Sequence, residues 1–163
     1  MNAMALPVTW SLLGEYFIPH RMQMLARMID RETGRELQAK FNLSVADWRV
    51  LGLTNTFGSA SAAEICNAFE IDRAEVSRAV ARLIKVGLIE RDKDPHHRSK
   101  KQISPTEKGK AIFERAVELR RAYFQKIMQD LSSEDVKAFD QMLRNIALRV
   151  DEFRQESDEQ STP

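Results

Sequence analysis

The 163-residue sequence predicts a mainly α-helical protein with one short pair of strands. Four segments place a capping side chain three residues before an acidic one, and an apolar periodic run follows each. These segments are Ser44–Asp47, Ser61–Glu64, Asp72–Glu75 and Ser132–Asp135. The capping side chain accepts a hydrogen bond from a backbone N–H that the helix leaves unpaired, and the acid suits the positive end of the helix. The four signals together predict four helix starts.

The remaining elements follow from turn residues and apolar spacing. The predicted helices cover, in order, residues 9–39, 44–56, 61–68, 72–87, 106–130 and 133–154. Gly87 ends the fourth helix because glycine readily adopts the left-handed conformation, and Thr106 caps the fifth. Two strands, 88–92 and 100–104, are joined by a loop in which Asp94 and Pro95 mark a turn.

The charge of the chain is nearly balanced overall but uneven along the sequence. The net charge is +1, which excludes a uniformly basic nucleic-acid coat protein. Residues 72–101 contain nine Lys or Arg against five Asp or Glu, whereas residues 151–163 contain one against five. A local excess of positive charge is typical of a surface that binds an anionic partner. Residues 155–163 are expected to form a disordered acidic tail.

Cysteine content and hydropathy favour a soluble, cytoplasmic protein. Cys66 is the single cysteine, so no intrachain disulfide can form. No apolar run approaches the roughly 18 residues of a membrane-spanning helix. The first ten residues lack a signal-peptide pattern. Hydrophobic residues make up 43% of the chain, which is enough for a packed core, and no membrane partner is expected.

The helices at 44–56, 61–68 and 72–87 form the pattern of a helix-turn-helix, and the strand pair after them adds a wing. A mainly α winged helix-turn-helix with a two-stranded wing and long flanking helices is therefore predicted. Such a motif inserts its last helix into the major groove of DNA.

The helix that starts at Asp72 has one apolar face and one charged face. Val76, Val80 and Leu83 recur at helical spacing, with Ala79 beside them, and are expected to pack on the two preceding helices. The residues that fall largely off that face are Arg73, Ser77, Arg78 and Arg82. Arginine forks match both phosphate oxygens and guanine edges, so this face is suited to double-stranded DNA.

The segment from Trp48 to Gly109 resembles the MarR family of bacterial transcriptional regulators. Its motifs VSRAVARL, GLIER and TEKG lie at the spacing of that family. The resemblance implies a homodimer that binds a palindromic operator, usually as a repressor, and that often releases DNA when a small, frequently aromatic ligand binds. It also implies that residues 9–39 and 107–154 form a helical dimerisation region beside a DNA-binding region at 40–106.

The expected DNA contacts lie on the fourth helix, at the start of the third helix and in the wing. They are Ser61, Ala62, Arg73, Ala74, Ser77, Arg78, Arg82, Arg98, Lys100 and Lys101. Ser77 and Arg78 are expected to contact bases or phosphates, and Arg82 and Lys101 to bind phosphates. The amides at the start of the third helix can also hold a phosphate. A wing arginine such as Arg98 can enter the narrow minor groove.

The wing departs from the family pattern at two positions. His97 stands where the family usually has an acid before the wing arginine, and Pro105 stands where leucine is usual. In the family that acid often helps to hold the arginine. The sequence therefore leaves the geometry and pH dependence of this wing open.

Two apolar stripes on the last two helices predict pairing with a second chain. The first has near-heptad spacing and comprises Val136, Phe139, Leu143, Ile146, Val150 and Phe153. The second comprises Ile112, Ala116, Leu119, Tyr123 and Ile127. A two-fold dimer would place two DNA-reading helices about one DNA turn apart, roughly 34 Å.

A small-molecule effector would bind, by the resemblance, where the dimerisation and DNA-binding regions meet. Tyr16, His20 and Trp48 are the candidate lining residues. Packing in the core explains Tyr16 and Trp48 equally well, so both interpretations stay open.

Other chemistry has little support in the sequence. Cys66 lies between apolar residues, which favours a small buried hydrophobe over an oxidant sensor. His96 and His97 are adjacent but have no second ligand motif, so no metal site is expected. No Gly-rich phosphate loop or nucleophile–base pair is present, so neither a cofactor nor enzymatic activity is expected.

Three functions therefore stay open. They are a ligand-responsive repressor, a constitutive DNA-binding regulator without an effector, and a helical dimer whose winged region makes protein contacts only.

Overall fold

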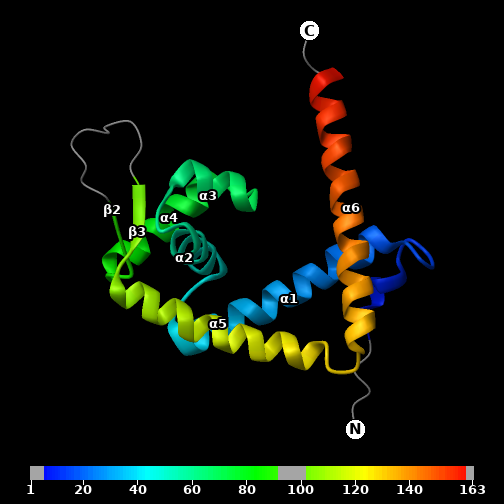
Figure 1. Ribbon diagram of the computed structural model, residues 1–163, viewed down its shortest axis with the longest axis horizontal. Helices are drawn as coiled ribbons and strands as arrows, with labels where there is room; N and C mark the ends of the chain where they lie inside the picture. The colour runs from blue at the N-terminus through cyan, green and yellow to red at the C-terminus, as the bar shows by residue number, and fades with distance from the viewer. Residues whose placement is uncertain (1–5, 92–101, 161–163) are drawn as a thin grey trace. The chain divides into compact units, whose positions relative to one another are not determined.

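The computed structural model describes residues 6–91 and 102–160, and for 158–160 only the backbone. The elements in order are η1 (Val8–Ser11), α1 (Ile18–Phe41), α2 (Val45–Phe57), β1 (Ala60–Ser61), α3 (Ala62–Phe69), α4 (Arg73–Lys85), β2 (Ile89–Arg91), β3 (Gln102–Pro105), α5 (Glu107–Ile127) and α6 (Ser133–Gln160) (Figure 1). The chain is mainly helical, as predicted. It divides into two compact units, Met1–Glu118 and Leu119–Pro163, and α5 passes from the first into the second.

The core of the first unit is built by α1 to α5 and the small sheet. α4 packs against α2 and α3, and its C-terminal end leads directly into β2. The largest fully buried side chains include Leu37, Leu51, Ile65, Leu83 and Ile89, which come from five different elements. Burial of this apolar surface provides the main stabilisation of the winged helix-turn-helix. None of the described helices is long and apolar enough to cross a membrane.

The sheet has three antiparallel strands in the order β1-β3-β2, where the sequence predicted two. Residues 60 and 61 form the additional strand β1, in which Ala60 pairs with Ile103 and Ser61 with Gln102. On the other side of β3, Ile89 pairs with Pro105 and Arg91 with Ile103. A strand of two residues is too short to show a periodicity in the sequence. β1 is recognised only by its pairing with β3, which is far away in the sequence.

The predicted helix starts are confirmed by hydrogen bonds. The Oγ atoms of Ser44, Ser61 and Ser132 accept from the backbone N–H three residues later at 3.1, 3.2 and 3.1 Å, and Asp72 Oδ1 accepts from Ala74 N at 2.7 Å. Thr106 Oγ1 likewise accepts from Gly109 N at 3.1 Å. Gly87 follows α4 with a φ of 73°, which confirms its role as a helix-ending residue.

The first long helix begins later than predicted. Residues 8–11 form a short 3₁₀ helix, and α1 starts only at Ile18. Gly14 and Tyr16 have φ values of 92° and 62°, which a right-handed helix does not allow. Pro19 lies in the first turn of α1, the only place where its missing N–H costs no helical hydrogen bond. The prediction of one helix from residue 9 is therefore wrong.

The last helix is longer than predicted, because α6 continues to Gln160. Residues 155–160 of the expected acidic tail are therefore helical, while 161–163 lie outside the described residues. Gln155 Nε2 donates to Asp151 Oδ2 at 3.0 Å, and Ser157 Oγ donates to Phe153 O at 2.8 Å. A side-chain hydrogen bond between residues four apart, such as that of Gln155 with Asp151, stabilises a helix and supports the extension.

Candidate nucleic-acid interface

The two faces of α4 differ as predicted. Val76, Ala79, Val80 and Leu83 are each at most 1% exposed and lie in the core. The opposite face carries exposed side chains at Arg73, Ala74, Ser77, Arg78 and Ala81. Arg73 and Arg78 make no ion pair with any residue that the structure describes. This face of α4 thus exposes two guanidinium groups and one hydroxyl group to solvent.

The N-terminal end of α4 is already capped by its own chain. Asp72 Oδ1 accepts from Ala74 N at 2.7 Å and from Glu75 N at 3.3 Å. A carboxylate therefore occupies the amides that would otherwise attract a phosphate. Contacts with an anionic partner at this helix start depend on side chains such as Arg73.

Arg82 lies one turn after Arg78 on α4, and its side chain, which is 49% exposed, reaches the start of α2. Its Nη2 donates to Asp47 Oδ1 at 2.9 Å and to Ser44 Oγ at 3.0 Å. Asp47 is only 3% exposed. The sequence predicted Arg82 as a phosphate contact, because nothing local to α4 indicates partners more than 30 residues earlier in the chain.

The start of α3 is also occupied by an internal carboxylate. Ser61 N donates to Glu64 Oε2 at 2.7 Å, and Ser61 Oγ accepts from Glu64 N. Ser61 is only 9% exposed and pairs with Gln102 in the sheet, while Ala62 is half-buried beside it. The capping box thus places a negative group where the sequence predicted a phosphate.

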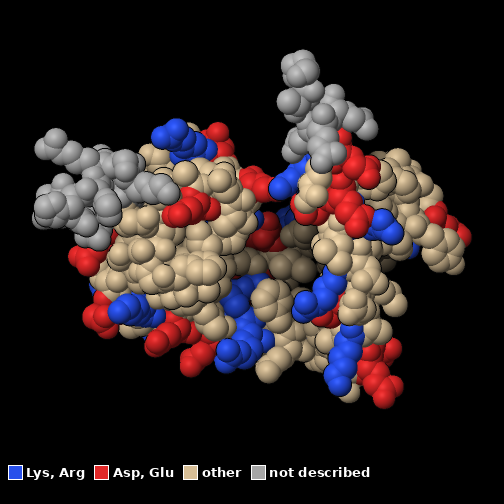
Figure 2. All heavy atoms as spheres, turned by 45° about the horizontal axis from the view of Figure 1, so that its top comes forward, with Lys and Arg blue, Asp and Glu red and all other residues tan. Residues whose placement is uncertain are grey.

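The wing residues Arg98, Lys100 and Lys101 lie outside the described residues, as do His96 and His97. The structure does place the two ends of this loop, since Arg91 is exposed at the end of β2 and Gln102 begins β3 (Figure 1). On the face seen in Figure 2, Lys and Arg side chains lie interspersed with Asp and Glu. That face is therefore of mixed charge.

The three candidate pocket residues do not come together within this chain. Tyr16 is 79% exposed, and His20 Nε2 lies 2.8 Å from Thr9 O. Trp48 instead stacks on Phe113 with ring centroids 5.0 Å apart.

The geometry of α1 and α2 explains this separation. Arg49 Nη2 lies 3.3 Å from Asp30 Oδ2, so the start of α2 is beside the middle of α1. Asp30 is about 15 Å along the helix from His20 at 1.5 Å per residue. The three residues are therefore not brought together within one chain, and their role in an effector pocket stays a prediction.

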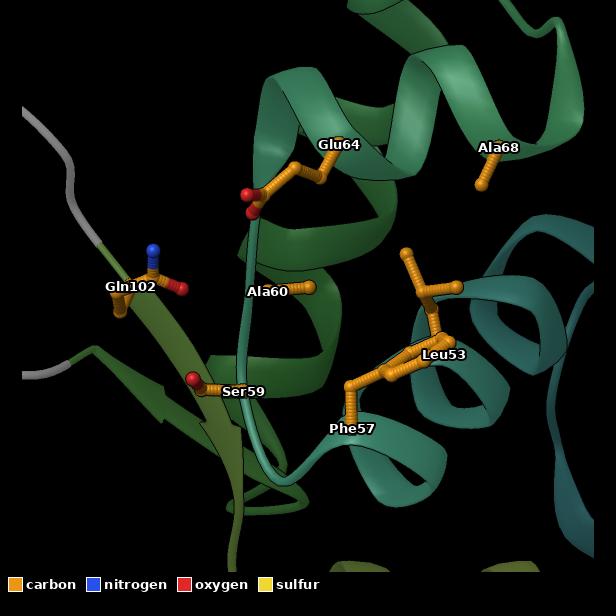
Figure 3. Close-up of a pocket in the computed structure, with 7 residues that line it drawn as sticks. All are labelled: Leu53, Phe57, Ser59, Ala60, Glu64, Ala68 and Gln102. Atoms are coloured by element: carbon orange, nitrogen blue, oxygen red, sulfur yellow. The ribbon is translucent and has the colours of Figure 1, made fainter.

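A different pocket, of about 420 Å³, lies between α2, α3 and the sheet (Figure 3). Its lining residues are Leu53, Phe57, Ser59, Ala60, Glu64, Ala68 and Gln102. Leu53 of α2 and Ala68 of α3 point toward one another, and Ser59 and Gln102 lie on the sheet side (Figure 3). Sequence reasoning missed this pocket, because the side chains come from four elements.

The predicted dimerisation residues of α6 are largely solvent-accessible in the single chain. Val136, Phe139, Ile146 and Val150 are 36%, 41%, 38% and 64% exposed, and Leu143 is half-buried. A stripe of this kind is unusual on a surface that stays in water. Its pairing with a second chain stays a prediction.

The second predicted stripe is divided between the two units. Ala116 is 0% exposed, and Ile112 packs against the core of the first unit. Ile127, in the second unit, is 44% exposed. The expectation that the whole stripe is available for pairing is therefore wrong, because its first part completes the winged helix-turn-helix core.

Within residues 6–91 and 102–160, no group of three or more His, Cys, Asp or Glu side chains could hold a metal ion. Cys66 is half-buried on α3 and packs against the core. This placement fits a small hydrophobic side chain.

Comparison with known proteins identifies related sequences and folds. The model of a family described as "MarR family" matches residues 41–98. The HTH-type transcriptional repressor IacR of Pseudomonas putida is 31% identical over 121 residues, which cover 73% of this chain and 72% of that protein. The HTH-type transcriptional regulator TcaR of Staphylococcus aureus (strain Newman) is 29% identical over 138 residues, which cover 83% of this chain and 87% of that protein.

Solved structures with the same fold share less sequence. A MarR/EmrR family transcriptional regulator from Acinetobacter sp. ADP1 has a TM-score of 0.74 at 20% identity, covering 83% of this chain and 95% of that one. A mutant MarR from E. coli complexed with operator DNA has a TM-score of 0.70 at 18% identity, covering 86% of this chain and 99% of that one.

Proposed function

The chain belongs to the MarR family of DNA-binding transcriptional regulators, and on this premise we propose that it is a homodimeric repressor of a palindromic operator that a small ligand releases. The observation that carries the proposal is the division of α4 into a buried apolar face and an exposed face with Arg73, Ser77 and Arg78. The related protein of Pseudomonas putida is named a repressor, which supports the direction of regulation.

α4 has dimensions that suit the major groove. It has 13 residues, and its length is therefore about 20 Å. An α-helix with its side chains is about 10–12 Å wide, which matches a groove of about 12 Å. Arg73 and Ser77 are four residues apart and share one side of the helix, with Arg78 beside them. In this proposal Ser77 and Arg78 contact base edges or phosphates. Arg73 contacts the sugar-phosphate backbone of the DNA, and the small side chain of Ala74 allows α4 to approach the DNA closely.

The wing supplies the remaining contacts in this proposal. The strands β2 and β3 pair antiparallel and follow α4 in the chain, so the loop that joins them belongs to the same winged region. Arg98 enters the minor groove, and Lys100 and Lys101 bind the adjacent phosphates. The minor groove attracts arginine because its electrostatic potential is strongly negative where it is narrow.

The exposed stripe on α6 supports a homodimer. Phe139, Ile146 and Val150 are apolar and follow a near-heptad spacing, so a second helix of the same kind would bury them. A two-fold arrangement repeats the DNA-reading surface at a distance of roughly 34 Å, which matches two half-sites of a palindrome. The operator symmetry thus follows from the symmetry of the protein.

A constitutive DNA-binding regulator without an effector is the second candidate function. It is favoured by the separation of Trp48 from Tyr16 and His20, the three residues that the sequence suggested as the lining of an effector pocket. An effector that binds between two chains would again favour the repressor that a small ligand releases.

Selection of duplexes from a random library by the purified chain, followed by footprinting on the DNA beside its own gene, tests the proposal. We expect a palindromic sequence to be enriched and protected, and one member of a panel of aromatic acids to release it. Protection that no compound relieves favours the constitutive regulator. Failure to retain any duplex at low salt contradicts DNA binding and favours the protein-contact function.

A further inference from the structure

We infer that Arg82 is a positioning residue, which sets the orientation of α4 through Ser44 and Asp47 and makes no contact with DNA itself. The inference rests on the proposed DNA binding by α4. It concerns how the DNA-reading face is held, and it replaces the phosphate contact that the sequence suggested for this arginine.

The contact joins the C-terminal half of α4 to the first turn of α2. Arg82 Nη2 donates to Asp47 Oδ1 at 2.9 Å and to Ser44 Oγ at 3.0 Å. Both acceptors belong to the capping box that starts α2. The arginine therefore ties α4 to a rigid helix end.

The acceptor groups are arranged so that one carboxylate oxygen is left for Arg82. Asp47 Oδ2 accepts from Ser44 N and from Ser44 Oγ, both at 2.8 Å. Ser44 Oγ in turn accepts from Asp47 N at 3.1 Å. The Asp47 side chain is only 5% exposed, and a buried carboxylate requires a charged or hydrogen-bonding partner. Arg82 provides that partner for Oδ1.

The apolar contacts of α4 are less directional than its hydrogen bonds. Val76, Val80 and Leu83 are fully buried, but hydrophobic contacts have little directionality. Charge-assisted hydrogen bonds are directional and short, so they fix the rotation and tilt of the helix.

A small tilt of α4 at Arg82 becomes a larger displacement at the N-terminal end of the helix, where Arg73 lies. Arg73 lies nine residues before Arg82, so a tilt of 10° about Arg82 would displace it by about 2 Å at 1.5 Å per residue. A displacement of this size is enough to break a hydrogen bond to a base edge. Loss of the ion pair should therefore reduce sequence discrimination more than general affinity.

A phosphate contact and a positioning contact predict different salt dependence. Each phosphate neutralised by a cation contributes about 0.9 to the slope of log K against log salt. A phosphate-binding arginine therefore lowers the slope when it is removed. A positioning arginine leaves the slope unchanged, because no counterion is released at its site.

The test compares Arg82→Gln, Asp47→Asn and the double variant with Arg78→Gln as the matched control. Asparagine at residue 47 can still accept from Ser44 N, so the cap of α2 is kept while the charge is removed. Arg78→Gln removes the same charge one turn earlier on the exposed face. Affinity and salt slope are measured for the duplex that the wild-type chain enriches and for a scrambled duplex of equal length.

We expect Arg82→Gln and Asp47→Asn each to lower the preference for the enriched duplex over the scrambled one by about tenfold, the size of coupling typical of a salt-bridge network. Their salt slopes should stay at the wild-type value. The double variant should recover part of the preference, because a glutamine–asparagine pair can hydrogen-bond without charge. Arg78→Gln should instead reduce the slope by about 0.9.

Three results would overturn the inference: a reduced salt slope in Arg82→Gln, an unchanged preference in Arg82→Gln, or no effect of Asp47→Asn. If the wild-type chain enriches no duplex at all, the proposed function fails first, which is a distinguishable outcome.

A measurement on the wild-type chain covers the case in which a variant does not fold. Nitrogen-15 labelled arginine side chains are observed by NMR with and without the enriched duplex. The Arg82 guanidinium signal should stay in place while that of Arg78 shifts. A shift of Arg82 equal to that of Arg78 would place Arg82 on the DNA and overturn the inference.

Discussion

Gly109 provides the sharpest test of how the wing is held against the helical core. It lies in the first turns of α5, and a Cβ atom built on it would be 1.9 Å from the backbone oxygen of Leu88. Real Cβ contacts essentially never come closer than 3.0 Å, so the two segments would have to separate by at least the difference. Leu88 immediately precedes β2, and its oxygen also accepts from Thr106 N at 3.1 Å. Gly109→Ala should therefore move the wing strand away from α5 and break that hydrogen bond.

The expected cost can be worked from these contacts. Overpacking against a backbone that cannot rotate away costs about 3 kcal/mol, and the lost hydrogen bond adds about 1 kcal/mol. Alanine in a helix gains about 1 kcal/mol over glycine. The net loss of unfolding free energy is then about 3 kcal/mol. The same shift displaces the base of the wing, so affinity for DNA should fall as well.

The matched control is the same substitution at Gly52 in α2. There a Cβ would lie 3.7 Å from Phe113 Cε2, an ordinary van der Waals contact. Gly52→Ala should leave the stability unchanged or raise it by up to about 1 kcal/mol. Urea unfolding followed by circular dichroism, at one protein concentration for all variants, measures both changes. A Gly109→Ala variant as stable as Gly52→Ala would refute the reasoning.

Arg98→Ala should weaken operator binding and lower the salt slope by about 0.9, measured by fluorescence anisotropy over a salt series, and an unchanged slope argues against a wing contact with DNA. Ile146→Glu places a charge in the α6 stripe and should shift the sedimentation of the chain from dimer to monomer; an unchanged dimer contradicts the proposed interface. The Ser132 hydroxyl and backbone N–H hold the pKa of Asp135 below its usual 3.8, so this carboxylate stabilises α6 above that pH and the contribution is lost as pH falls through the lowered pKa. Ser132→Ala should raise the pKa of Asp135 toward 3.8 in an NMR titration, and an unmoved pKa contradicts the assignment of the cause.

Local signals in the sequence determined most of the helix boundaries. The caps at Ser44, Ser61, Asp72 and Thr106 act within three residues of themselves, so they are readable without any tertiary contact. The two faces of α4 are likewise encoded in its own periodicity. These features were enough to predict the winged helix-turn-helix and its exposed arginines.

Even local reasoning failed at the start of α1, where apolar spacing continued through a break in the helix. The left-handed conformation of Tyr16 is uncommon for a non-glycine residue, and no residue type demands it. Gly14 and Pro19 were the available signals, since one permits a turn and the other is suited to a first helical turn. The prediction followed the apolar periodicity instead of these two residues, and it therefore extended the helix through the break.

Only the tertiary structure decided which polar and apolar groups meet. Arg82 is separated from Asp47 by 35 residues, and β1 exists only because β3 lies beside it. Ala116 belongs to the same apolar stripe as Ile127, yet it is buried in the core while Ile127 stays exposed. Burial and ion pairing depend on which surfaces the chain brings into contact, and composition and spacing do not specify that. The sequence by itself thus determined the elements and the chemistry of α4, whereas packing determined that Arg82 is ion-paired with another helix of the chain.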